Sequence, residues 1–188
     1  MKELSALLFC VMIVFVYINY IRRNLYLDKI ISSVNNKPYY VRNLPDKKLA
    51  ADKLANIGIS LQKLIDSLDN ETDNKRLKDS FNSDYITENI PGSTYVAYSL
   101  NKGEELSICI REKDTEKFID NNIIIFVAIH ELAHIMTEEL GHTDTFWKNM
   151  SFLLKRASSL GIYKIVDYSK YPVTYCGMKI DSSPINKY

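Results

Sequence analysis

Residues able to bind and use a metal ion lie in one short stretch of the sequence. Residues 130–134 read HELAH, which is the H-E-x-x-H pattern. Residues four apart on a helix share a face, with Cβ atoms about 5–6 Å apart, so His130 and His134 can reach one zinc ion. Glu131 then lies beside the metal, where it can take a proton from zinc-bound water and pass it to the leaving amine. The pattern predicts a zinc hydrolase site with Glu131 as its catalytic base.

A catalytic zinc site needs a third protein ligand and leaves its fourth position to water. His142 is the leading candidate, because Gly141 can adopt a left-handed conformation and turn the chain back towards the ion. Asp144 is the runner-up ligand. Glu138, one helical turn beyond His134, is an outside candidate or an acceptor for an imidazole N–H.

All three histidines of the 188-residue chain fall between positions 130 and 142. The alternative is that His130 and His134 are ordinary residues of a buried helix. Two imidazoles and a carboxylate would then be buried without partners, which is energetically costly. Because a bound metal ion removes that cost, we expect a metal site.

The helix that carries the motif is expected to be buried on every side. It continues the stretch Ile123–Ile129, which has no polar face. Asn121 or Asn122 can cap its start, and Gly141 is its expected stop.

The elements around this helix follow from apolar periodicity and turn residues. Leucine and isoleucine at helical spacing predict a helix that begins after Pro45-Asp46, and a shorter helix follows near 75–81. Alternating residues predict a β-hairpin over 94–111, whose outer strand either aligns an extended peptide or has a purely structural role. Thr143 is the expected N-cap of a last helix over 144–160.

At this point residues 121–147 resemble the WLM and SprT-like group of zinc metallopeptidases. The resemblance is carried by the HELAH motif, Gly141-His142 and the aromatic pair Phe146-Trp147. Membrane-anchored proteins of large DNA viruses are similar over the whole soluble part, including a segment like Tyr175–Met178, and the match is looser outside residues 121–147. The resemblance implies an α+β, zincin-like fold with a buried active-site helix and a small antiparallel sheet. It also implies a polypeptide substrate and Zn²⁺, with His130, His134 and His142 as ligands and Glu131 as base.

Two departures limit the resemblance. Well-known members act on DNA–protein crosslinks through basic and partner-binding tails. For this sequence we expect a membrane span over the first 23 residues and no such tail, so that substrate is not implied. The spacing from His134 to His142 also exceeds that of the metzincin motif, which disfavours a metzincin.

The tail after Tyr163 is expected to be extended, and it holds weaker candidates for catalysis. Tyr168 or Tyr175 could supply a phenol to the oxyanion, although packing is the default role of each. Met178 could mimic a methionine turn beneath the zinc, but a core methionine is favoured.

The first 23 residues predict a membrane anchor. The run Leu4–Ile21 is uncharged and reaches the roughly 17–25 residues that a spanning helix needs. A cleavable signal peptide is disfavoured, because no small-residue cleavage site follows. Counting Lys and Arg in the two flanks places the catalytic domain in the cytosol. Sequons at Asn70 and Asn149 would be glycosylated only in the opposite orientation.

The composition is that of a folded globular protein, with 46% hydrophobic and 25% charged residues. A net charge of +1 provides no strong nucleic-acid signal. Cys10, Cys109 and Cys176 predict neither a cysteine zinc site nor a disulfide scaffold, although a single Cys109–Cys176 bridge stays open. The expected organisation is an anchor over 1–23, a polar connector over 24–44 and a zincin-like metallopeptidase domain over 45–188.

The sequence thus leads to a membrane-anchored zinc metallopeptidase. The alternative is a non-catalytic, zinc-stabilised, membrane-anchored protein that binds a partner or serves a structural role. A weaker reading is a structural virion or membrane protein with a vestigial site. Glu131 beside the histidines favours the enzyme, because a structural site has no use for a base there.

Overall fold

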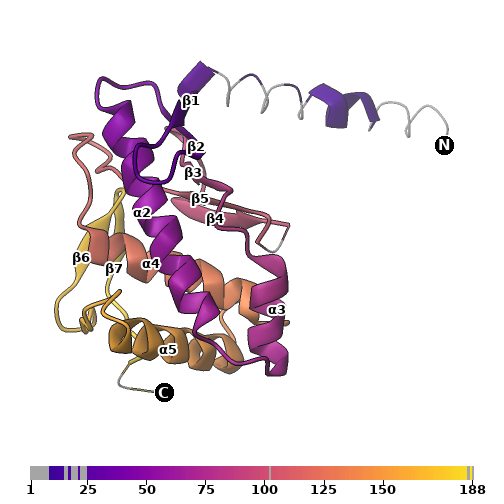
Figure 1. The fold of residues 1–188 in the computed structure, drawn as a ribbon, viewed down its shortest axis with the longest axis vertical. Coiled ribbons are helices and arrows are strands. Elements are labelled where there is room, and N and C mark those ends of the chain that lie inside the picture. Colours follow the sequence, from indigo (N-terminus) through magenta and orange to yellow (C-terminus); the bar gives the residue numbers. More distant parts are fainter. Residues whose placement is uncertain are drawn as a thin grey trace.

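The computed structural model describes residues 9–14, 17, 21, 25–101, 103–185 and 187. The main sheet contains β1 (Leu27–Ile31), β2 (Pro38–Arg42), β3 (Ile86–Glu88), β4 (Ala97–Leu100) and β5 (Glu105–Ile108). The helices are α2 (Lys47–Asp66), α3 (Thr72–Ser80), α4 (Asn121–Met136) and α5 (Asp144–Ser159). A separate hairpin consists of β6 (Val173–Tyr175) and β7 (Met178–Ile180). Figure 1 shows α2 passing beside the sheet and in front of α4, with α4 below the main sheet and α5 at the bottom of the view. The expected α+β class is confirmed.

The five strands have the order β1-β2-β3-β5-β4, and the sheet is mixed. The outer pairs β1–β2 and β4–β5 are antiparallel hairpins, whereas β3 is parallel to both of its neighbours. The expectation of an antiparallel sheet is therefore wrong at its centre. Parallel strands need a long crossover connection, and α2 and α3 provide it between β2 and β3.

Residues 27–42 lie within the region expected to be a polar connector, yet they form β1 and β2. The side chains of Tyr39 and Val41 alternate towards the interior and are buried. Helix α2 begins one residue after the predicted Pro45-Asp46 signal, and its buried face contacts β1, β2 and β3. These strands belong to the folded domain because their apolar residues cover one side of α2.

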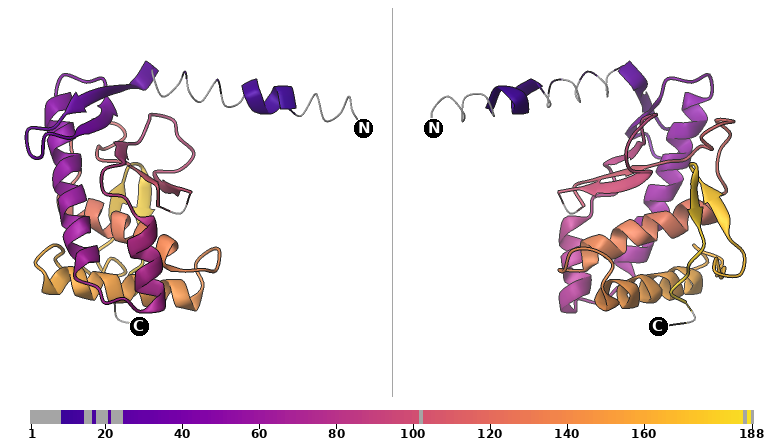
Figure 2. Two further views of the ribbon diagram at one scale, coloured as in Figure 1. Left: turned by 45° about the vertical axis from the view of Figure 1, so that its right-hand side comes forward. Right: turned by 180° about the vertical axis from the view of Figure 1, so that it is seen from behind.

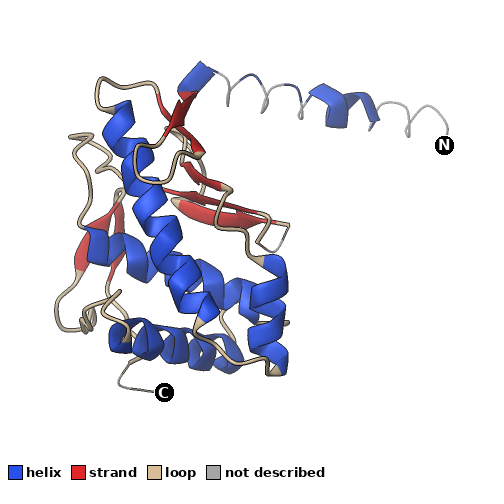
Figure 3. Ribbon diagram, in the orientation of Figure 1, coloured by secondary structure: helices blue, strands red, loops and turns tan. Residues whose placement is uncertain are grey.

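Helix α4 lies between the main sheet and α5 and contacts both of them (Figure 1). Figure 3 shows this layering of helices against strands, and the view from behind in Figure 2 shows the β6–β7 hairpin beside one end of α4. Residues 124–129 are buried throughout, as an all-apolar helix requires. The prediction that Asn121 or Asn122 caps this helix is wrong. The N-cap is Asp120, whose carboxylate accepts from the backbone amide of Asn122.

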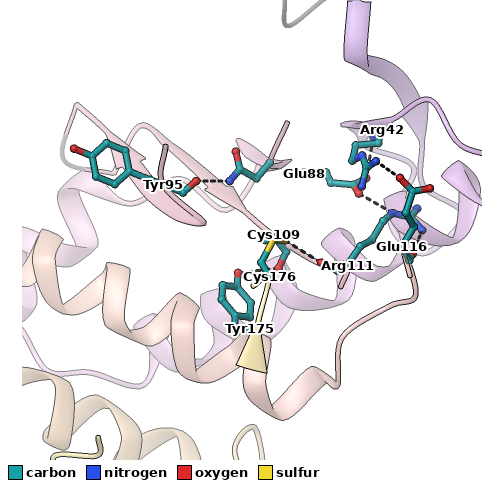
Figure 4. The surroundings of a disulfide bond; sticks show 9 residues. Arg42, Glu88, Tyr95, Cys109, Arg111, Glu116, Tyr175 and Cys176 are labelled. Carbon is teal, nitrogen blue, oxygen red and sulfur yellow. Dashed lines mark hydrogen bonds and ion pairs between the residues drawn. A yellow bond between two sulfur atoms is a disulfide. The ribbon is translucent and has the colours of Figure 1, made fainter. Parts of the chain in front are cut away.

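A disulfide bond joins Cys109, directly after β5, to Cys176 in the turn between β6 and β7 (Figure 4). The bridge left open by the sequence is thus formed. The tail expected to be merely extended forms a hairpin here, because Cys176 and Gly177 both have positive φ, as a type I′ turn requires. The Tyr175 hydroxyl donates to the Cys109 carbonyl oxygen at 2.8 Å and reinforces this junction.

A buried arginine holds the segment that follows the disulfide. The Arg111 guanidinium is 2.7 Å from the carboxylates of both Glu88 on β3 and Asp46 at the start of α2. It also lies over the Phe118 ring at 4.3 Å. Figure 4 shows Arg111 reaching from the disulfide region towards Arg42 and Glu88. These contacts hold the loop after β5 against the sheet.

In the described part of the chain, no helix is both long and apolar enough to cross a membrane. The anchor expected over Leu4–Ile21 lies mostly outside the described residues, which include only 9–14, 17 and 21 of that run.

Candidate active site

The three histidines converge on one point. His142 Nε2 lies 3.2 Å from His134 Nε2 and 3.1 Å from His130 Nε2. Among the described residues, these three form the group of side chains able to hold a metal ion, with ligand atoms within 4.8 Å of one another. The structure therefore brings together the three residues predicted as ligands.

The donor set fits a zinc ion. Tetrahedral ligands at bond lengths of about 2.0–2.1 Å are separated by about 3.3–3.4 Å, close to the observed nitrogen–nitrogen distances. Hydrogen bonds alone do not explain the cluster, because His142 Nε2 carries either one hydrogen or one lone pair and can form a well-directed hydrogen bond with only one of the two nitrogens. The pKa of His130 is lowered to about 3, mainly by burial and to a smaller extent by the neighbouring imidazoles. The pKa of His134 is lowered to about 4, mainly by burial and to a smaller extent by His142. Both rings are therefore neutral and offer lone pairs.

The chain reaches His142 by a different route from the one expected. Helix α4 ends at Met136 and not at Gly141, because buried Thr137 is extended and its hydroxyl accepts from the Asn149 side chain on α5 at 3.0 Å. Gly141 has a φ of +84° and supplies the left-handed turn within the loop before His142.

The alternative ligands lie elsewhere. Asp144 is outside the metal-binding group of the described residues and forms the first residue of α5, where Thr143 caps the helix as predicted. Glu138 is 81% exposed and forms an ion pair with Arg76 at 3.0 Å. Neither carboxylate joins the three imidazoles.

Glu131 is buried on α4 and faces the sheet. Burial raises its pKa to about 7, while a hydrogen bond with the Ser99 backbone on β4 acts to lower it. A carboxylate whose pKa lies near neutrality is well suited to accept a proton and return it. The contact with Ser99, which sequence reasoning did not foresee, links the candidate base to the outermost strand of the sheet.

A cavity of about 1060 Å³ opens over the histidines. One wall is residues 89–99, which include the start of β4, and another is the turn between β6 and β7. Helix α4 contributes His130, Glu131 and His134 to the lining. The volume is large enough for several residues of an extended polypeptide.

The weaker candidates in the tail have packing roles. Tyr175 is buried with its hydroxyl bound to Cys109, and buried Tyr168 packs edge-on against Phe126 at 4.7 Å. Neither tyrosine lines the cavity in the described part of the molecule. Met178 is 46% exposed at the start of β7 and lines the cavity, so it is not a core methionine.

Comparison with known proteins places this arrangement in context. A family model described as the WLM domain matches residues 77–177. An uncharacterised protein of Acanthamoeba polyphaga mimivirus is 36% identical over 158 residues, which cover 80% of each chain. An uncharacterised protein of Invertebrate iridescent virus 6 is 41% identical over 69 residues, covering 36% of this chain and 38% of the relative. The crystal structure of Wss1 from Saccharomyces cerevisiae is similar in fold, with a TM-score of 0.52 and 18% identity over 64% of this chain and 87% of Wss1.

Proposed function

This chain belongs to the WLM domain family of SprT-like zinc metallopeptidases, and on that premise we propose that it hydrolyses peptide bonds of an extended polypeptide. The observation that carries the proposal is the convergence of three imidazole nitrogens beside a buried glutamate. His130, His134 and His142 would hold Zn²⁺. When bound, zinc polarises a carbonyl as a Lewis acid and lowers the pKa of its water to about 7.

Glu131 would act as the proton carrier of the reaction. Its carboxylate takes a proton from the attacking water and returns it to the amine that leaves. The Ser99 backbone contact holds the carboxylate on the side of the cavity formed by β4.

Strand β4 would align the substrate. It is the outermost strand of the sheet and is paired with β5, while residues 94–99 line the cavity. A free strand edge offers main-chain donors and acceptors to an extended peptide, which adds as a further strand. This recognition favours unfolded or flexible segments over folded surfaces.

Attachment to a membrane, with the catalytic domain in the cytosol, is a further part of the proposal and is carried by the sequence of residues 1–23. Membrane fractions washed with alkaline carbonate should retain the full chain and release a chain that starts at residue 24. Release of both chains would contradict the anchor.

The decisive experiment compares Glu131→Gln with the exposed control Glu138→Gln. We expect Glu131→Gln to retain zinc, measured by elemental analysis, and to lose at least about 100-fold in the rate of casein hydrolysis, because the proton carrier is gone. The control should retain both properties. Full activity of Glu131→Gln would show that the assigned base is wrong. A zinc-containing wild type without hydrolysis would favour the non-catalytic alternative.

A further inference from the structure

The three candidate ligands are not held equally firmly by the fold. His130 and His134 lie on α4, whose buried backbone sets their positions. His142 is exposed and lies in the loop between α4 and α5. Gly141 before it has a φ of +84°, and a Cβ there would meet nothing within 4 Å. The loop itself therefore offers little packing to orient the third imidazole.

An indole ring from α5 covers the His142 imidazole. The Trp147 and His142 rings are stacked, with centroids 5.5 Å apart and an angle of 28° between their planes. Trp147 meets His130 differently, edge-on at 6.4 Å and 73°. Phe146 completes the support, with its ring edge-on to His142 at 4.7 Å.

Helix α5 is a firm base for this stack. Phe146 is fully buried, and the Thr143 hydroxyl caps the helix by accepting from the Phe146 amide. The Asn149 side chain also binds the hydroxyl of Thr137, at the start of the loop. Both ends of the loop are thus tied to α5, and Trp147 occupies the position next to the buried Phe146.

Histidine ligands are usually oriented by a hydrogen bond from their second ring nitrogen to a carboxylate or carbonyl. In the part of the chain that the structure describes, the hydrogen-bond contacts of His142 are those of its Nε2 with the other two imidazoles. Ring contacts from α5 are therefore what can set the plane of this imidazole, and Trp147 provides the stacked one beside the edge-on contact of buried Phe146.

We infer that Trp147 is a positioning residue: its indole holds the His142 imidazole in the orientation that completes the metal site. The inference depends on the proposed zinc site but not on hydrolysis. Without the indole the His142 imidazole can rotate, so zinc binding must then offset the entropy that is lost when the ring is ordered.

The test measures zinc affinity of the full chain by competition with a chromogenic chelator. Trp147→Ala should weaken zinc binding about tenfold or more, the scale seen when the partner that orients a ligand is removed. Trp147→Phe, which keeps an aromatic face, should recover most of the affinity. Phe152→Ala removes a part-exposed aromatic side chain from the same helix, away from the cavity lining, and should leave affinity unchanged.

A double-mutant cycle separates positioning from a general structural effect. In a His142→Ala background, Trp147→Ala should produce no further loss of zinc affinity, because the ring it positions is absent. An equal loss in both backgrounds would overturn the inference, and so would unchanged affinity in the single variant. Failure of the wild type to bind zinc would instead refute the proposed metal site, together with this inference.

Discussion

At the level of single residues, His142 is the ligand on which the site depends most. It is the one member of the cluster outside α4, and its Nε2 lies within 3.2 Å of both other ring nitrogens. Asp144, two residues later, competed with it as a candidate and is outside the cluster. The two residues can therefore be distinguished by metal content.

We expect His142→Ala to weaken zinc binding by more than the roughly 10–100-fold that loss of an outer partner costs, because a direct ligand is removed. Asp144→Ala should bind zinc like the wild type. Elemental analysis after dialysis against a weak chelator checks both. Zinc lost from the Asp144 variant and kept by the His142 variant would reverse the ligand assignment.

At the level of elements, a charged contact joins the β1–β2 turn to α2. The Asp52 carboxylate on α2 accepts from the Ser32 and Ser33 hydroxyls at 2.6 and 2.7 Å. These hydrogen bonds lower the pKa of Asp52, and the one from Ser32 has the largest effect. A carboxylate with a lowered pKa in the folded state stabilises the fold above its unfolded pKa, and this contribution is lost as pH falls through the folded value.

Asp52→Asn should therefore lower the urea midpoint at pH 7 and have progressively less effect as the pH falls below about 4. Asp114→Asn, which changes an exposed carboxylate in the loop before α4, is the control. It should have little effect on the urea midpoint at pH 7 or at low pH. A difference between Asp52→Asn and the wild type that persists unchanged to pH 2 would mean that the carboxylate charge is not the cause.

The turn between β4 and β5 requires a glycine next to α3. Gly103 has a φ of +118°, and a Cβ at this position would lie 2.9 Å from the carbonyl oxygen of Ser80. Gly161 after α5 has a φ of +71° but open space around it. Comparing alanine substitutions at these two glycines therefore separates the energetic cost of backbone strain from that of a steric clash.

Gly103→Ala should reduce the free energy of unfolding by about 1–3 kcal/mol or more, because strain and a backbone clash add. Gly161→Ala should cost only about 1–2 kcal/mol, the strain of a left-handed residue. Chemical denaturation of both variants provides the comparison, and an equal cost would show that the Ser80 contact is relieved easily.

At the level of the whole molecule, the Cys109–Cys176 disulfide connects the main sheet to the β6–β7 hairpin. The two cysteines are 67 residues apart, and their bond joins two parts of the cavity wall. Disulfides persist in oxidising compartments, whereas the positive residues after the apolar run predict a cytosolic domain. The state of these thiols in cells therefore also bears on the side of the membrane.

Cys176→Ser should lower the free energy of unfolding by about 4 kcal/mol, the chain-entropy estimate for a loop of this length. Urea unfolding with and without a reducing agent checks this, since the reductant should affect the wild type and not the variant. Alkylation of the full chain, denatured in detergent but not reduced, should modify Cys10, a free cysteine in the proposed anchor, and leave Cys109 and Cys176 unmodified. Modification of all three in protein from cells would show that the bridge does not form there.

Much of the candidate site could be predicted from the sequence because it depends on local rules. Helical spacing placed His130 and His134 on one face, and Gly141 indicated a turn that brings back His142. The hairpin over 94–111 and the helix after Thr143 likewise follow from alternation and capping within a few residues.

Only the tertiary structure decided which distant segments meet. The parallel pairing of β3, the inclusion of β1 and β2 in the sheet and the Cys109–Cys176 bond all join residues far apart in the sequence. The early end of α4 depends on a contact from Asn149, and the stacking of Trp147 on His142 depends on how α5 packs against α4. Spacing along the chain carries no information on such contacts, because they are chosen by the free energy of packing the whole core.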